Sequence, residues 1–130
     1  RLHNAAAEAD EQTYFSLFSP AAVFLGSDPA ERWTIDELRA FAEPYFERDS
    51  AWVYHALRRD IRLFGENAAV FDETLTHEKY GLCRGTGVLR RIRGEWKIDQ
   101  YSLSIPIPNE FVDEVIQPIR EKAMTVEDPR

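Results

Sequence analysis

The sequence has only one cysteine, Cys83, among its 130 residues. No disulfide can therefore form within the chain, and no cysteine-based metal cluster is present. No apolar run approaches the roughly 18 residues that span a membrane. Residues 1–12 lack the apolar stretch of a secretion signal. We therefore expect no bound metal and no membrane partner.

The cellular compartment is not fixed by these absences. The chain does not start with methionine, so a leader could have preceded residue 1. A cytoplasmic location is the favoured interpretation, and export is the alternative if a leader was removed.

An excess of positive charge is also missing. The 16 lysines and arginines are outnumbered by 23 aspartates and glutamates, which gives a formal net charge of −7. Such a field repels the phosphates of a nucleic acid. Arg90, Arg91 and Arg93 lie close together but have acidic neighbours, so we interpret them as a solvated strand end. We expect no nucleic-acid partner.

Apolar residues, in contrast, are plentiful. They make up 44% of the chain and include eight Phe, five Tyr and three Trp, enough for one well-filled core. We find no internal repeat and no linker. The sequence therefore predicts one domain over residues 1–130, with a tail that frays from about residue 122.

The first third of the chain has helical spacing. Apolar residues predict one helix over residues 2–18, ended by Ser19-Pro20, and a short strand over residues 21–26. Thr34 and Glu37 have the spacing of a capping box, which predicts the start of a second helix. Pro44 is expected to end or kink that helix.

After residue 50 the apolar period changes from 3.6 to 2. This pattern predicts four strands, over residues 51–64, 67–75, 82–91 and 95–107. A last helix is expected to be capped by Asn109 and limited by Pro118. The predicted fold class is α+β, with helices covering one face of a curved antiparallel sheet.

The stretch LCRGTGVLRR, residues 82–91, contains Gly85 and Gly87. A dinucleotide fingerprint needs a third glycine and a following helix, and a phosphate-binding loop needs a lysine, so neither motif is present. We expect no cofactor. Two glycines on one face of a strand instead predict a strand that curves around a cavity.

The turn after this strand has two candidate forms. A three-residue turn over residues 92–94 is favoured because Gly94 can take a positive φ, and it places Val88 opposite Ile98. A two-residue turn at Arg93-Gly94 places Leu89 opposite Ile98 instead. The favoured register also gathers polar side chains on one face: Arg84, Thr86, Gln100 and Ser102.

Three stretches together resemble a known family: GSDPAERW (26–33), RGTGVLRR (84–91) and the W-x-I-x-Q pattern of residues 96–100. The chain resembles the SnoaL-like proteins of the nuclear transport factor 2-like superfamily over roughly residues 3–110. The resemblance implies a cone-shaped, cystatin-like fold with a pocket between sheet and helices, and often a homodimer that pairs through the outer sheet face. It implies no single activity, because the superfamily includes isomerases, cyclases, dehydratases, hydrolases and proteins without a known reaction.

Two acidic residues are candidates for proton transfer. Asp72 and Glu73 are adjacent on a strand, so only one of them can point into the pocket. The neighbouring apolar residues do not decide which one. A carboxylate paired with an arginine would have a lowered pKa and would be a poor base, whereas an unpaired carboxylate in an apolar pocket could move protons.

His55 and Arg59 share the apolar face of the first long strand. A buried arginine must find an anion, either a protein carboxylate or a ligand. Because dehydratases of the superfamily use a pocket histidine, the resemblance makes His55 a third catalytic candidate. The same strand places Trp52 and Tyr54 on the other face, where they would support a dimer.

The candidate ligand-binding residues are Arg59, Arg84, Thr86, Gln100, Trp33, Tyr45 and Tyr14. The first hypothesis is a homodimeric domain that binds a partly apolar small molecule carrying a carboxylate or other oxygen groups. The second is a cofactor-independent isomerase, dehydratase or hydrolase that uses Asp72, Glu73 or His55 as a base. The third is a non-catalytic assembly module. Whether the protein is an enzyme stays open.

Overall fold

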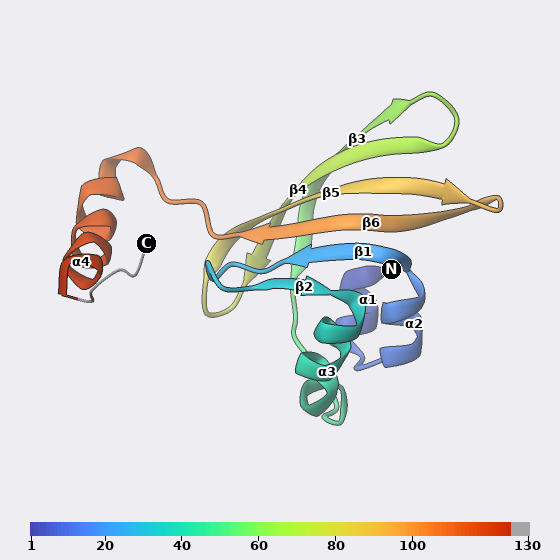
Figure 1. The fold of residues 1–130 in the computed structure, drawn as a ribbon, viewed down its shortest axis with the longest axis horizontal. Coiled ribbons are helices and arrows are strands. Elements are labelled where there is room, and N and C mark those ends of the chain that lie inside the picture. Colours follow the sequence, from blue (N-terminus) through green and yellow to red (C-terminus); the bar gives the residue numbers. More distant parts are fainter. Residues whose placement is uncertain (126–130) are drawn as a thin grey trace.

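The computed structural model describes residues 1–125, in which helices cover one face of a curved sheet (Figure 1). The helices are α1 (Leu2–Ala7), α2 (Glu11–Ser16), α3 (Ile35–Phe46) and α4 (Val112–Thr125), with a 3-10 turn over Asn109–Phe111. The strands are β1 (Phe18–Leu25), β2 (Arg32–Thr34), β3 (His55–Phe64), β4 (Ala68–His77), β5 (Gly81–Ile92) and β6 (Glu95–Ser104). The α+β fold class predicted from the sequence is confirmed.

The strands form one sheet in the order β2-β1-β6-β5-β4-β3. Strands β3 to β6 are an antiparallel meander, as their turn signals predict. Strand β1 pairs antiparallel with β2 and parallel with β6. In Figure 1, α1, α2 and α3 lie together on one side of the sheet, below β1 and β2 in this view. The long hairpins of β3 to β6 therefore extend past the edge of the helical layer.

The single helix predicted over residues 2–18 is wrong. The chain breaks between α1 and α2 at Ala9, whose φ of 54° is left-handed. Asp10 then caps α2, because its carboxylate accepts a hydrogen bond from the Thr13 amide at 3.2 Å. Phe18 already belongs to β1. Aspartate is a strong N-cap and a weak helix-interior residue, so a new helix can begin directly after Asp10.

The second helix begins as predicted. The Thr34 hydroxyl accepts a hydrogen bond from the Glu37 amide at 3.2 Å, and the Glu37 carboxylate accepts one from the Thr34 amide at 3.1 Å. This is a complete capping box. Pro44 lies inside α3, which ends two residues later at Phe46.

The favoured register of the β5–β6 hairpin is wrong, and the alternative holds next to the turn. Arg93 and Gly94 both have positive φ, of 53° and 80°, as a two-residue type I′ turn requires. Leu89 accordingly lies opposite Ile98. Beyond that pair Asp99 is an extra residue, and the pairing shifts by one. The carboxylate of Asp99 accepts a hydrogen bond from the buried Ser19 hydroxyl of β1 at 2.7 Å.

The C-terminal helix differs from its prediction both in its cap and in its length. Pro108, not Asn109, precedes the 3-10 turn, and no side chain caps it. Helix α4 continues through Pro118 and past residue 122 to Thr125, and the rest of the predicted frayed tail, residues 126–130, lies outside the described residues. Figure 1 shows α4 beyond the end of β6, apart from the other helices. Within residues 1–125 no helix is both long and apolar enough to cross a membrane.

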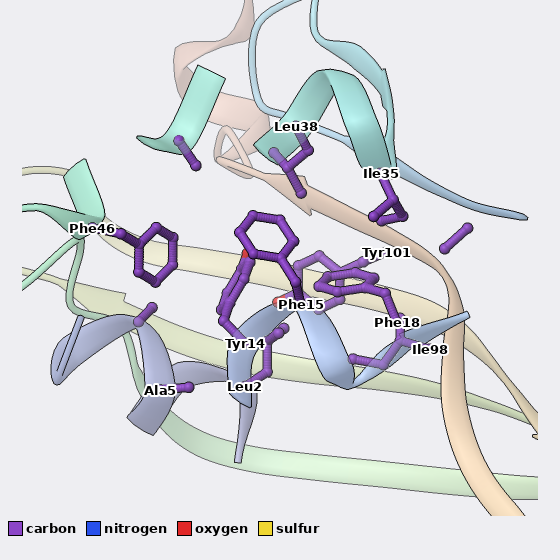
Figure 2. Close-up of a cluster of buried hydrophobic side chains, with 13 residues drawn as sticks. Leu2, Ala5, Tyr14, Phe15, Phe18, Ile35, Leu38, Phe46, Ile98 and Tyr101 are labelled. Atoms are coloured by element: carbon purple, nitrogen blue, oxygen red, sulfur yellow. The ribbon is translucent and has the colours of Figure 1, made fainter. Parts of the chain in front are cut away.

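The core lies between the helices and the inner face of the sheet (Figure 2). Tyr14 of α2 is at its centre, with its ring centroid 5.0 Å from that of Phe15 and 5.2 Å from that of Phe46. Trp52 packs edge-on against Tyr14 at 5.6 Å. The prediction that Trp52 lies on the outer sheet face is therefore wrong, because Trp52 precedes β3 and packs against Tyr45 and Phe46 of α3.

Candidate functional site

Of the two adjacent carboxylates, Glu73 points to the inner side of the sheet. Its side chain is 1% exposed, whereas Asp72 is exposed on the opposite face. The alternation along β4 explains this, because Glu73 shares its face with the buried residues Ala69 and Leu75. A buried carboxylate needs partners for all of its lone pairs.

Three residues supply these partners. Oε1 of Glu73 accepts a hydrogen bond from Nε of Arg59 at 2.8 Å and lies 2.7 Å from Nη2 of the same guanidinium. Oε2 accepts from the Tyr101 hydroxyl at 2.6 Å and lies 2.7 Å from Nε2 of His3. Because an ionised carboxylate can only accept, Nε2 of His3 carries the proton. We call these four residues the Glu73 cluster: His3, Arg59, Glu73 and Tyr101.

The cluster fixes the charge of Glu73. Burial by itself raises the pKa of this carboxyl, but the hydrogen bonds from His3, Tyr101 and Arg59, together with the attraction to His3, lower it to about 2. Burial and the nearby carboxylate raise the pKa of Tyr101 well above its usual range. At neutral pH Glu73 is therefore a paired anion and Tyr101 a proton donor, so Glu73 is a poor general base.

Gly85 allows the cluster to form. It lies on β5, directly opposite Glu73 of β4. A Cβ atom at this position would come within 2.6 Å of Oε2 of Glu73 and would collide with the Tyr101 hydroxyl. Gly87 makes room for the Phe71 ring in the same way, because a Cβ atom there would lie 2.6 Å from that ring. The two glycines thus let side chains of the flanking strands meet over β5.

A cavity of about 330 Å³ opens beside the cluster, and we call it the Arg59 cavity. Its walls are largely apolar. Its lining residues are Arg1, Leu2, His3, Leu17, Arg59, Ile61, Phe71, Glu73, Leu89, Trp96, Ile98 and Tyr101. The Arg59 side chain is 43% exposed, so it is anchored by Glu73 but still reaches the cavity and solvent. Its guanidinium keeps further N–H groups for an anion.

Of the predicted site residues, the structure places Arg59 and Glu73 at the Arg59 cavity. Four others are on the outer face of the sheet, where they border solvent or a shallow depression: Asp72, Arg84, Thr86 and Gln100. Arg84 alternates with the buried Cys83, so it cannot face the cavity. His55 is exposed at the start of β3. Thr86 and Gln100 do share one face, as predicted, but it is the outer face, and Thr86 lies opposite Ser102 while Gln100 lies opposite Val88.

The three aromatic candidates lie elsewhere. Trp33 and Tyr45 line a second groove beside α3. Tyr14 is buried in the core and borders only a small cavity of about 20 Å³. Burial raises the pKa of Tyr14 well above its usual range, which keeps its hydroxyl neutral.

Sequence reasoning missed His3 and Tyr101. His3 is 70 residues from Glu73 along the chain, and no local pattern links them. The sequence contained only an indirect sign of Tyr101. A glycine inside a strand, such as Gly85 in β5, indicates that another group approaches the strand's backbone closely. Among residues 1–125, no cluster of three or more His, Cys, Asp or Glu side chains could hold a metal ion.

Comparisons with known proteins agree with this fold. The family model described as a SnoaL-like domain matches residues 1–108. No curated protein is similar enough to count as a match. A nuclear transport factor 2-like protein of unknown function from Pseudomonas putida superposes with a TM-score of 0.69 at 15% identity, covering 85% of this chain and 82% of that one.

Two further solved structures have the same fold. A protein of unknown function of the DUF3225 family from Pectobacterium atrosepticum has a TM-score of 0.66 and 22% identity, covering 80% of this chain and 81% of its own. A protein of unknown function with a cystatin-like fold from Nostoc punctiforme has a TM-score of 0.65 and 14% identity. The match covers 82% of this chain and 84% of that one. At these identities the likeness concerns the fold alone.

Proposed function

Because the chain belongs to the SnoaL-like domain family, whose fold commonly encloses a small-molecule pocket, we propose that it binds a partly apolar small molecule through an anionic oxygen group. The ligand occupies the Arg59 cavity. One observation carries the proposal: Glu73 holds Arg59 in place through two short contacts, while 43% of the arginine side chain stays exposed.

The cavity suits such a ligand in shape and chemistry. Its volume of about 330 Å³ is at the small end of the range for ligand pockets. Leu89, Phe71 and Trp96 provide apolar walls for the body of the ligand. The guanidinium of Arg59 is planar and always charged, and its remaining N–H groups can hold a carboxylate. Since Glu73 already orients the guanidinium, binding needs little further ordering.

The test is a titration with phenylacetate and with its neutral amide, phenylacetamide, followed by calorimetry. The carboxylate is expected to bind at least about tenfold more tightly than the amide, because charge-assisted hydrogen bonds to arginine are the stronger ones. Arg59→Gln is expected to remove this preference. Arg59→Lys keeps the charge that Glu73 requires and is expected to retain the fold with weaker binding.

Arg58→Gln is the matched control. Arg58 is the adjacent arginine, but its side chain is 76% exposed and its Nε bonds Asp60 at 2.9 Å on the outer face. Its replacement is expected to leave the affinity within about twofold, as for a distant surface charge. The proposal would be refuted if phenylacetate and phenylacetamide bound equally tightly. It would also be refuted if Arg59→Gln and Arg58→Gln changed the affinity equally.

A second candidate function is proton transfer by His3. The observation in its favour is the 2.7 Å contact between Nε2 of His3 and the Glu73 carboxylate, the arrangement by which a carboxylate orients a basic imidazole. In this role Nδ1 is the base and Glu73 a positioning residue. The measurement is deuterium uptake from D2O at the α-carbon of a small ketone such as phenylacetone. Uptake catalysed by the wild type and lost in His3→Gln supports the role, and equal uptake by both refutes it.

We also propose that the domain forms a homodimer through the outer sheet face. The depression on that face combines Val70 and Val88 with the polar side chains of Asp72, Thr86 and Gln100. A mixed surface of this kind is typical of a non-obligate interface. Light scattering after size-exclusion chromatography gives the mass, and a monomer at micromolar concentration would refute the dimer.

A further inference from the structure

A second concavity lies between α3, the loop of residues 26–31 and the turn that joins β4 to β5. Its volume is about 440 Å³. Rings form most of its lining, and we call it the aromatic groove. The rings belong to Phe24, Trp33, Phe41, Tyr45, Trp52, Tyr54, His77 and Tyr80. It has no lining residue in common with the Arg59 cavity. A ligand of the groove would therefore touch none of the residues that line the Arg59 cavity.

The rings of the groove form two continuous runs. In the first, Phe41 stacks on Trp33 with a centroid separation of 5.0 Å and lies 5.7 Å from Tyr45, which in turn lies 6.0 Å from Trp52. In the second, His77 lies 4.8 Å from Tyr54 and stacks on Tyr80 at 4.6 Å. Phe41 and Tyr80 are 41% and 45% exposed. Phe41 and Tyr80 thus present ring surface that residues 1–125 leave partly exposed.

The charged lining residues of the groove are acidic. They are Asp28 and Glu31, and among residues 1–125 no lysine or arginine is part of the lining. Nδ1 of His77 accepts hydrogen bonds from the amides of Lys79 and Tyr80, which hold the ring in the turn beside the groove. The Arg59 cavity has the opposite character, with Arg1 and Arg59 among its lining residues.

We propose that the aromatic groove binds an organic cation of the alkylated ammonium class. The negative face of an aromatic ring attracts a cation within about 6 Å, and a methylated ammonium leaves water more readily than a lysine ammonium does. Two rings of the groove already attract cations of the chain. The Arg48 guanidinium lies 5.0 Å from the Tyr45 ring centroid, and the Lys79 ammonium lies 5.4 Å from that of Tyr80.

The two carboxylates complete the recognition. Glu31 is held in the loop, because its Oε1 accepts a hydrogen bond from the Asp28 amide at 2.9 Å. Asp28 is held by the Ala30 amide, also at 2.9 Å. Both carboxylates are therefore fixed at the groove before a ligand arrives. Fixed acidic groups beside rings favour a charged ammonium over a neutral molecule of the same shape.

The experiment compares choline with 3,3-dimethylbutan-1-ol, which has the same shape but carries no charge. Trp33 and Trp52 line the groove, and Trp96 lines the other cavity. A Trp96→Phe background therefore reports the groove by tryptophan fluorescence. Choline is expected to give a saturable change, with an affinity at least about tenfold higher than that of the alcohol.

Two substitutions and one control locate the site. Trp33→Leu removes a ring, and Glu31→Gln removes a charge but keeps an amide oxygen that can still accept from Asp28. Each is expected to weaken choline binding at least about fivefold. Glu66→Gln removes an exposed carboxylate in the β3–β4 turn, outside the groove, and is expected to change the affinity less than twofold. Trp33→Phe keeps an aromatic ring and is expected to retain part of the affinity.

Three results would overturn the proposal. The first is no binding of choline at millimolar concentration. The second is equal binding of choline and the neutral alcohol, which would show that the groove is only apolar. The third is an affinity that Trp33→Leu and Glu31→Gln leave unchanged while both proteins are folded by circular dichroism, which would place the cation elsewhere.

Discussion

The Tyr101 hydroxyl on β6 donates a hydrogen bond of 2.6 Å to Oε2 of Glu73 on β4, although β5 lies between these two strands. The contact is made above Gly85, which has no side chain to separate the two groups. It ties non-adjacent strands together and supports the carboxylate that anchors Arg59. The stability of the sheet and the geometry of the Arg59 cavity are therefore expected to depend on the same few residues.

Replacing Glu73 by glutamine is expected to destabilise the protein. The amide keeps the shape but leaves Arg59 and His3 without their anion, and loss of one partner in a buried charged network costs about 3 kcal/mol. Urea unfolding measures the change. Glu66→Gln is the control, because Glu66 is an exposed carboxylate in the β3–β4 turn, away from the Glu73 cluster, and surface changes of this kind stay within about 0.5 kcal/mol. Equal effects of the two variants would contradict the buried network.

The stability of the wild type is expected to fall in acid because of Glu73. The pKa of this carboxyl is about 2 in the folded chain, against a reference value of 4.5. A lowered folded pKa contributes stability above the unfolded value and loses it as the pH falls toward the folded value. The contribution is about 3 kcal/mol, and its loss starts below about pH 4.5. Urea unfolding between pH 7 and pH 3 measures it.

Glu73→Gln provides the reference for that pH series. Its side chain does not titrate, so the difference in unfolding free energy between wild type and variant is expected to shrink as the pH drops. If this difference stays constant down to pH 3, Glu73 is not the cause of the loss of stability in acid.

Replacing Gly85 by alanine is expected to break the contact between Glu73 and Tyr101. The added methyl group would lie within 2.6 Å of Oε2 of Glu73, so one of the two side chains must move. Overpacking together with a strained hydrogen bond costs about 2–3 kcal/mol. Thermal or urea unfolding tests this, with Thr86→Ala as the control on the outer face of the same strand. A Gly85→Ala variant as stable as the wild type would show that the cluster can rearrange without cost.

Replacing Thr34 by alanine is expected to destabilise the start of α3. The Thr34 hydroxyl caps the helix by accepting from the Glu37 amide, and loss of such a cap costs about 1 kcal/mol. Thr34→Ser keeps the hydroxyl and is expected to recover most of the stability. Urea unfolding of both variants makes the comparison, and equal losses would assign the effect to the methyl group of Thr34.

The features that the sequence predicted correctly are local. The capping box of Thr34 and Glu37 needs residues only three apart, and the strands of the meander follow from a period of two over about ten residues each. The fold was predicted from the three stretches that resemble the SnoaL-like proteins, because their order and spacing match that family over most of the chain. The break at Ala9 was missed because a cap at Asp10 and a continuous helix satisfy the same apolar pattern.

The site required information that no short stretch contains. The choice between Asp72 and Glu73 depends on which face of the sheet the helices cover, and that is set by the packing of α1, α2 and α3. The shift at Asp99 is accompanied by a hydrogen bond from Ser19, 80 residues away. His3 meets Glu73 only after the first helix folds back onto β4.

The sequence by itself thus determined the start of α3 and the four strands of the meander, since these depend on residues close together in the chain. The tertiary structure decided which charged groups are buried together. Burial of a carboxylate is tolerated only where several distant donors converge on it, and this convergence is a property of the whole fold.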